Sequence, residues 1–225
     1  MLWLGLDGAL GAFSAAVAAA DGSVPARTAT ADGGDALERG LALIDEVLDG
    51  RPLSALAGIA VGTGPGGFTG LRIALSYAKS LAFGAGLPLV GVSSYDALEP
   101  AGAAGTYATF VHGRAGIACV RLRGAGEELT ACGAYAALAD ALAERFPRGG
   151  ELISYGRAEG AAPALGERGI IVRAMPIEET VPALAIARRA IARRETTGLA
   201  HAVVADYGEA HYAERKPAGG STRSR

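Results

Sequence analysis

The 225-residue chain has few of the residues from which metal centres and disulfide frameworks are built: two cysteines and three histidines. The histidines show none of the short spacings that zinc and iron sites use, so we expect no metal ligand set from His112, His201 and His211. The two cysteines flank the turn Gly124-Ala125-Gly126, which could pair their strands. For Cys119 and Cys132 we expect free buried thiols, with a disulfide as the alternative.

Long apolar runs and an excess of one charge are also missing. The longest uncharged window, residues 52–71, is broken by glycines and prolines that a membrane-spanning helix would rarely collect. The net charge is −2, which gives no bulk attraction for nucleic acid. The apolar start MLWLGLDG carries Asp7 and no preceding positive residues, so we expect no secretory signal, no membrane contact and a cytoplasmic protein.

Apolar periodicity predicts an α/β fold in two lobes. The first lobe, residues 1–100, opens with hairpin strands and continues into helix 35–48, strand 56–61, helix 69–83 and strand 87–92. A strand, helix and strand in this order favour a parallel pair. The second lobe, residues 101–213, repeats the theme more faintly, with strands at 107–111, 117–122, 129–134, 152–155 and 170–173 and helices at 136–146 and 182–194. The two halves therefore suggest a duplicated ribonuclease-H-like unit, and we expect the tail 214–225 to be disordered.

The stretch GTGPGGFTGLR, residues 62–72, raises a functional question because a glycine-rich turn before a helix is typical of phosphate cradles. A Walker loop is excluded because no lysine occurs before Lys79. A dinucleotide fingerprint fits Gly62, Gly64 and Gly67, but Pro65 removes an amide donor and the next strand ends in Ser93-Ser94 without an acidic residue. A nucleophile at Thr69 or Ser76 would need a base that the sequence does not place nearby. The remaining interpretation is a tight strand-to-helix turn.

The following helix carries a stripe of small residues, since Gly70, Ala74 and Ala78 recur every four positions. Such a stripe allows close approach of a second helix, and it fits equally a sheet of the same chain.

Residues 59–98, IAVGTGPGGFTGLRIALSYAKSLAFGAGLPLVGVSSYDAL, resemble the hallmark segment of the TsaB (YeaZ) family, in which a strand is followed by G-P-G-S-F-T-G-L-R, a helix and a strand ending in G-V-S-S. The residues that match this motif are Gly64, Pro65, Gly66, Phe68, Thr69, Gly70, Leu71 and Arg72. Gly67 replaces the serine of the motif. The family's opening D-T-S appears as Asp7-Gly8-Ala9, without the two hydroxyls that related ATPases use near phosphate.

The resemblance implies the actin/Hsp70-like ATPase architecture of two ribonuclease-H-like lobes, here with a reduced second lobe. It implies a role without catalysis and without a cofactor: dimerisation with a TsaD-like catalytic subunit in bacterial synthesis of tRNA N6-threonylcarbamoyladenosine. A TsaE-like ATPase would join the complex, and this chain would contact tRNA only as part of the complex. Whether the isolated chain forms a homodimer stays open.

The partner-facing helices would be 35–48 and 69–83, and the residues expected at the interface are Leu37, Leu41, Thr69, Gly70, Arg72, Ile73, Ala74, Tyr77, Ala78 and Leu81. Two alternatives stay open. One is a nucleotide-dependent kinase-like or peptidase-like enzyme of the same superfamily. The other is direct tRNA binding through the basic tail residues Arg215, Lys216, Arg223 and Arg225.

Overall fold

A computed structural model describes residues 1–21, 27–31, 36–113, 116–177, 181–193 and 202–208 of the chain. The predicted disordered tail, 214–225, lies outside these residues, as do His201 and His211. No helix in the described ranges is long and apolar enough to cross a membrane.

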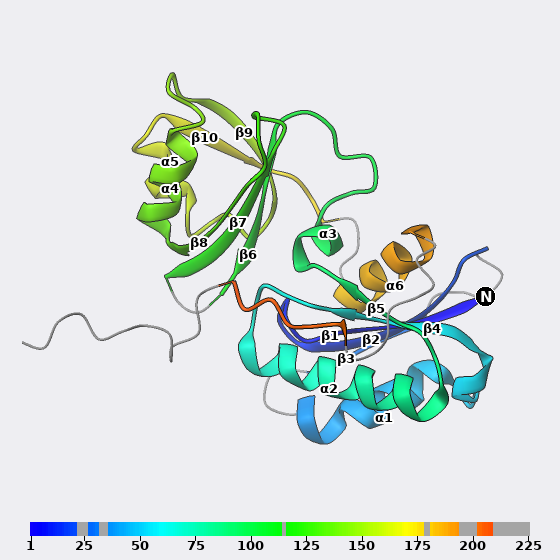
Figure 1. Cartoon of the computed structure of the whole chain (residues 1–225). Coiled ribbons are helices and arrows are strands. Elements are labelled where there is room, and N and C mark those ends of the chain that lie inside the picture. Colours follow the sequence, from blue (N-terminus) through cyan, green and yellow to red (C-terminus); the bar gives the residue numbers. More distant parts are fainter. Residues whose placement is uncertain (22–26, 32–35, 114–115, 178–180, 194–201, 209–225) are drawn as a thin grey trace, which may run out of the picture.

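Two five-stranded mixed sheets form the two lobes (Figure 1). The first has the order β3-β2-β1-β4-β5 and the second the order β10-β9-β6-β7-β8. In each sheet three antiparallel strands are followed by two strands that pair in parallel. The second sheet therefore repeats the strand arrangement of the first sheet, starting from the opposite edge. The predicted duplication of the sheet topology is confirmed.

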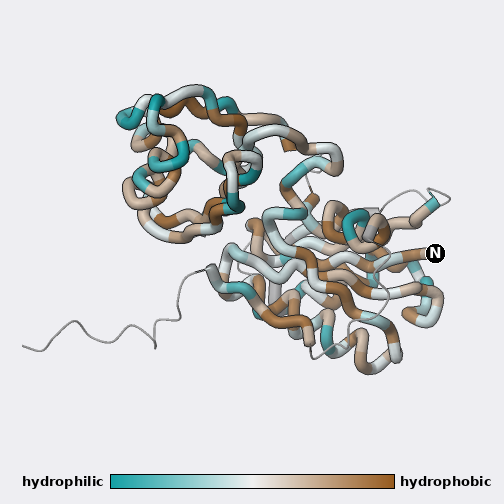
Figure 2. Tube along the Cα trace, turned by 45° about the horizontal axis from the view of Figure 1, so that its top comes forward, coloured by the Kyte–Doolittle hydropathy of each residue, from teal (hydrophilic) through white to brown (hydrophobic). Residues whose placement is uncertain are grey.

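The first lobe has helices on both faces of its sheet. Its strands are β1 (Leu2–Asp7), β2 (Phe13–Ala19), β3 (Arg27–Ala31), β4 (Leu56–Gly62) and β5 (Leu89–Val92). Helices α1 (Ala36–Leu48) and α2 (Phe68–Ala85) cover one face, and α6 (Pro182–Arg193) covers the other (Figure 1). The 3-10 turn η2 (Leu53–Ala55) leads into β4. Strands β1 and β4 are buried on both sides, which explains why their sequences are nearly continuous apolar runs (Figure 2).

The second lobe keeps the sheet but has smaller helices. Its strands are β6 (Tyr107–His112), β7 (Ile117–Arg123), β8 (Leu129–Ala134), β9 (Gly150–Gly156) and β10 (Ile170–Ala174). Helices α4 (Tyr135–Ala143) and α5 (Ala162–Gly166) cover its outer face, and the short α3 (Ser94–Leu98) joins the lobes (Figure 1). Because α4 and α5 have nine and five residues, against 13 and 18 in α1 and α2, the second lobe is the reduced one.

Helix α6 packs on the first lobe, although its residues fall in the range predicted for the second. We predicted residues 101–213 as the second lobe, but α6 packs against β1, β2 and β4 of the first sheet. Its Ala183, Ile186 and Ala187 are buried there, and the Ala183 carbonyl reaches the place a side chain at Gly5 would occupy. Small residues on both elements permit this close approach. The exact division of the chain between the lobes stays a prediction, and α6 belongs by its contacts to the first.

Candidate functional site

The glycine loop between β4 and α2 is packed on both sides by other backbone. Gly64 and Gly66 have φ values of 95° and 151°, a region that favours glycine. A side chain at Gly66 would collide with the carbonyl oxygen of Ala9, and one at Gly64 with that of Asp206. The Gly67 N–H donates to the Ala9 carbonyl at 2.8 Å. The glycines therefore allow a tight turn, in line with the last of the four interpretations of the sequence.

A C-terminal segment, residues 202–208, lies along this loop and continues toward the second sheet (Figure 1). The Asp206 N–H donates to the Thr63 carbonyl at 2.7 Å, and Val203 packs near Gly91. Gly208 leaves no space for a side chain between Pro65 and the sulfurs of Cys119 and Cys132. The segment thus connects the loop to the second lobe, and nothing in the sequence pattern indicated it.

The two sulfurs form a disulfide between β7 and β8, so the expectation of free thiols is wrong. Residues Cys119 and Cys132 are direct partners in the antiparallel register. The alternative that the sequence left open, a disulfide across the turn Gly124-Ala125-Gly126, is therefore the one observed.

Asp7 ends β1 with a fully buried side chain. Its Oδ2 accepts from the Leu10 N–H at 2.9 Å, while Oδ1 has no hydrogen-bond partner among the described residues. Burial raises the pKa of Asp7 to about 6, and hydrogen bonds from the amides of residues 8–10 limit the rise. These amides, which follow β1, therefore donate to the carboxylate of the chain itself.

The raised pKa of Asp7 gives a pH dependence of stability. The folded chain keeps the proton up to about pH 6, whereas the unfolded chain releases it near the ordinary value of 3.8. The free energy of unfolding should therefore fall by up to about 3 kcal/mol as pH rises through this window. Urea titrations between pH 4 and pH 7 should show that the free energy of unfolding changes less with pH in Asp7→Asn than in the wild type. Asp45→Asn, on the exposed face of α1, should show the same pH dependence as the wild type. Parallel curves for wild type and Asp7→Asn would contradict the assignment.

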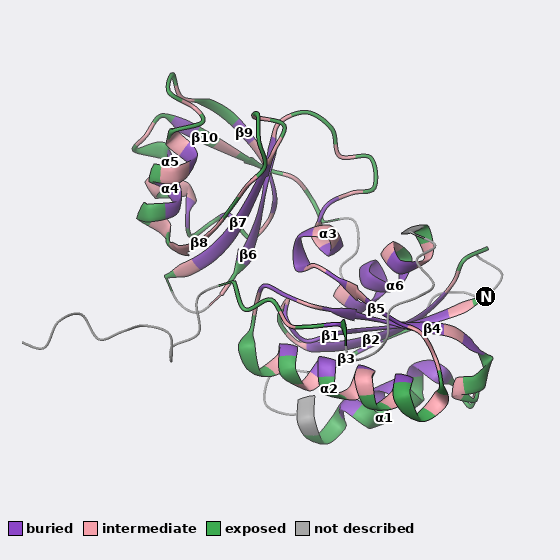
Figure 3. Ribbon diagram, viewed as in Figure 1, coloured by how far each residue is buried: buried purple, intermediate pink, exposed green. Residues whose placement is uncertain are grey.

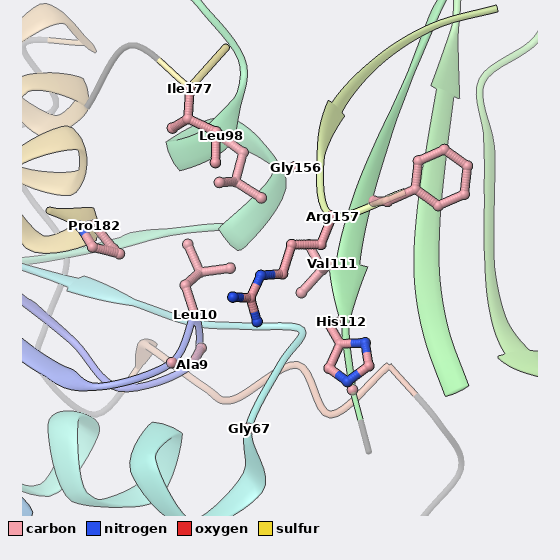
Figure 4. A pocket seen from close by; sticks show the side chains of 13 residues that line it. Ala9, Leu10, Gly67, Leu98, Val111, His112, Gly156, Arg157, Ile177 and Pro182 are labelled. Atoms are coloured by element: carbon pink, nitrogen blue, oxygen red, sulfur yellow. The ribbon is translucent and has the colours of Figure 1, made fainter. Parts of the chain in front are cut away.

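A cleft of about 400 Å³ lies between the lobes, next to the turn after β1 (Figure 4). Its walls are apolar, and Arg157 extends into it from one side (Figure 4). The His112 Nδ1 lies 3.4 Å from the Tyr135 hydroxyl. The apolar wall residues are Leu10, Leu98, Val111, Ile177 and Pro182. In the described part of the chain, no three His, Cys, Asp or Glu side chains are grouped closely enough to hold a metal ion.

A buried charge network fixes α3 to the second sheet. Glu99 accepts from the Arg121 Nε at 3.0 Å and from Arg123 Nη1 at 3.1 Å, and Arg121 Nη2 donates to Asp96 at 2.6 Å. Thr109 donates a further hydrogen bond to Glu99, and Arg189 of α6 donates to its carbonyl oxygen. Only the arginines alternating in β7 signalled this network in the sequence, because charged residues are unusual in a buried strand.

The predicted partner residues divide into exposed and buried sets. Thr69, Arg72 and Leu41 are exposed, Leu41 by 56%. Ile73, Tyr77 and Leu81 of α2 are half-buried and pack against the core of the first lobe. The ring of Tyr77 lies over Gly40 of α1. The side chain of Leu37 lies outside the described residues.

The small-residue stripe faces the interior, which corrects its placement at a partner interface. Ala74 and Ala78 have no exposed surface, and a side chain at Gly70 would collide with the backbone of Gly8. In Figure 3, α2 carries buried segments as well as exposed ones. Small residues are needed here because α2 packs tightly on its own sheet. Of the two interpretations of the stripe, contact with the sheet of the same chain is the one observed.

Comparisons with known proteins agree with these features. Residues 35–163, more than half of the chain, match the family model described as TsaD: tRNA N6-adenosine threonylcarbamoyltransferase. The protein described as tRNA threonylcarbamoyladenosine biosynthesis protein TsaB of Haemophilus influenzae is 42% identical over 66 residues. That aligned stretch spans 28% of this chain and 28% of the relative.

Two solved structures share the fold. A Pseudomonas aeruginosa protein described as similar to peptidase YeaZ has a TM-score of 0.67 and 25% identity, covering 92% of this chain and 99% of that chain. The ethanolamine utilization protein EutJ of Carboxydothermus hydrogenoformans has a TM-score of 0.52 and 14% identity, covering 84% of this chain and 90% of that chain, and its likeness concerns the fold alone. The expected two-lobe architecture of the actin/Hsp70-like ATPases is confirmed.

Proposed function

The chain belongs to the TsaD family, as a member of TsaB (YeaZ) type, and we propose that it serves the synthesis of N6-threonylcarbamoyladenosine in tRNA as a non-catalytic subunit. The proposal assigns it a TsaD-like catalytic partner, a TsaE-like ATPase in the assembled complex, and a cytoplasmic location. Homodimerisation of the isolated chain remains a prediction within it.

The observation that carries the pairing role is the outer surface of α1 and α2. Leu41, one of the residues that we expected at the interface, is more than half exposed on α1. The positions that α1 buries are instead Leu43, Ile44, Val47 and Leu48. Ile73 and Tyr77 of α2 lie half-buried on the side of α2 turned toward α1. We propose Leu41, together with the half-buried Ile73 and Tyr77, as the partner face that meets another helix pair.

The enzymatic alternatives find less support in the described residues. A nucleotide phosphate would need the amides that follow β1, and the Asp7 carboxylate accepts from them. A peptidase would need a nucleophile beside a base. Both thiols form the disulfide, and His112, the one histidine in the described ranges, contacts Tyr135 rather than Thr69 or Ser76.

Leu41→Lys should weaken pairing with a TsaD-like partner about tenfold or more, because it replaces an apolar contact by a charged group that must be desolvated on pairing. The fold should be retained, since Glu38 and Asp45 lie three and four residues away on the same exposed side and favour a lysine. Co-purification of tagged partner with each variant measures the effect, with circular dichroism to check folding.

Ile171→Lys is the matched control, since Ile171 is 71% exposed on β10 of the second sheet. It makes the same chemical change far from α1 and α2. Equal recovery of the partner with both variants would remove the proposed face, and no recovery with the wild type would remove the pairing role.

A further inference from the structure

The disulfide between Cys119 and Cys132 lies at an accessible edge of the second sheet. Strand β8, which carries Cys132, is the last strand of that sheet, so within the described residues no further strand covers it. Cys119 is buried and Cys132 is half-buried. Disulfides that a dissolved thiol can reach are the ones that exchange readily. The chain has only these two cysteines, so its reaction with a reductant is confined to this pair.

The disulfide is in direct contact with the C-terminal segment 202–208. A Cβ at Gly208 would lie 2.5 Å from the sulfur of Cys119 and 2.8 Å from that of Cys132. It would also lie 3.0 Å from Pro65 of the glycine loop. The φ of Gly208 is 70°, in the left-handed region that favours glycine. The backbone of Gly208 therefore packs against both the disulfide and the glycine loop, without room for an additional atom.

The same segment is fixed to the glycine loop through its backbone. The Asp206 N–H donates to the Thr63 carbonyl at 2.7 Å. The Asp206 carbonyl oxygen occupies the place that a side chain at Gly64 would need. Residues 202–208 therefore link the loop of the first lobe to the disulfide of the second, and Gly208 makes the contact with the disulfide.

Breaking the disulfide changes the space available to Gly208. In the oxidised pair the two sulfurs share a bond, whereas two thiols repel each other until they are separated by an ordinary non-bonded contact. Cys119 packs against Tyr95 and Val111 in a buried cluster, so its sulfur has little room to move on that side. The separating sulfurs therefore displace Gly208, whose backbone already packs against them.

We propose that the pair Cys119 and Cys132 is a site of thiol–disulfide exchange, and that its reduction releases residues 202–208 from the glycine loop. The co-reactant is a dithiol reductant. Its thiolate attacks the sulfur of Cys132, the bond between the two cysteines breaks, and the electron pair leaves with the Cys119 thiolate. The second thiol of the reductant then attacks the mixed disulfide and expels the Cys132 thiolate. Two electrons and two protons pass to the cysteine pair, and the reductant leaves as its own disulfide.

A cytoplasmic location would expose this pair to dithiol reductants, since cytosolic proteins rarely keep permanent disulfides. The inference rests on the proposed function for this location alone. In the reduced form the segment no longer joins the glycine loop to the second sheet, whereas the hydrogen bonds of Glu99 to the second sheet stay in place. The exchange therefore changes the surroundings of the glycine loop and leaves the fold of both lobes intact.

The test measures hydrogen–deuterium exchange of the full chain before and after addition of dithiothreitol, by mass spectrometry of a peptide that covers Asp206. Reduction should speed exchange in this peptide about tenfold or more, because the Asp206 N–H loses its hydrogen bond to Thr63. Peptides from β1 and β4 should keep their exchange rates. A count of free thiols that rises from none to two per chain shows that the pair has been reduced.

Two variants separate the contact from the redox chemistry. Gly208→Ala should give fast exchange at Asp206 with the disulfide intact, because the added Cβ has no room. Cys132→Ser should give fast exchange that dithiothreitol does not change, because no disulfide forms. Gly84→Ala is the matched control for the glycine substitution, since Gly84 is exposed on α2 with open space around it, and this variant should respond as the wild type does.

The outcomes separate this inference from the proposed function. Unchanged exchange at Asp206 in the reduced chain would overturn the inference, and so would a disulfide that dithiothreitol leaves intact in the folded chain. Faster exchange in β1 and β4 as well would also overturn it, because reduction would then unfold the first lobe. Each of these outcomes leaves the proposed function untouched, since partner recovery is measured separately. A segment that responds to reduction in a chain that recovers no partner would instead count against the proposed function alone.

Discussion

Arg121→Met should lower the free energy of unfolding by about 3–5 kcal/mol, because it leaves the carboxylate of Glu99 buried without its principal cation. The Arg121 side chain is buried and bridges Glu99 and Asp96, at 2.8 Å and 2.6 Å from their oxygens. Its guanidinium also lies 4.9 Å from the centroid of the Tyr95 ring. Methionine keeps the apolar contacts of the side chain and removes only the charge and its hydrogen bonds.

Urea denaturation of Arg121→Met and of Arg168→Met distinguishes this network from an ordinary ion pair. Arg168 lies 2.6 Å from Asp140, but the Asp140 side chain is well exposed, so Arg168→Met should cost less than about 1 kcal/mol. Glu99→Gln should cost less in the Arg121→Met background than alone, since the two side chains act as one unit. Equal losses for the two arginines would show that Glu99 is not held by this network.

The position of Glu99 gives this loss a consequence beyond stability. Glu99 follows α3, which comes directly after β5 of the first sheet, and its side chain accepts from β6 and β7 of the second. Arg189 of α6 donates to its backbone carbonyl. The network therefore fixes the two lobes and α6 relative to one another, and with them the walls of the cleft.

The elements that could be predicted from sequence are those whose signal is local. Apolar periodicity within the element itself predicts the buried strands β4 and β5, the hairpin strands and helix α2. Each lies within a few residues of its predicted bounds. The parallel pairing of β4 with β5 could also be predicted, because a strand–helix–strand connection obeys few topological rules.

What could not be predicted depends on contacts between distant parts of the chain. The packing of α6 on the first sheet, the Glu99 network and the docking of residues 202–208 on the glycine loop each join segments far apart in sequence. In the described part of α1, the apolar residues outnumber the positions that the core can take, and Leu41 is left outside. Periodicity identified an apolar helix there but could not choose between neighbouring faces.

Ala74→Glu should abolish the folded state, in contrast to the pairing defect that a partner-facing stripe would predict. Ala74 is fully buried between α2 and its sheet, so a glutamate there would bring an unpaired charge and excess volume into a closed core. A buried unpaired charge costs several kcal/mol and overpacking about 1–3 kcal/mol more, a sum comparable with the whole stability of a typical domain.

Ser76→Glu is the matched control, since Ser76 is exposed on the same helix two residues away. It should change the free energy of unfolding by less than about 0.5 kcal/mol. Thermal unfolding followed by circular dichroism, with the soluble fraction after expression, measures both variants. If the Ala74→Glu chain folds and only its pairing is lost, the result would support the original assignment of the stripe to the partner interface. Loss of the fold would instead show that the stripe holds α2 against its own sheet, so that a partner contact of α2 would have to use its outer residues.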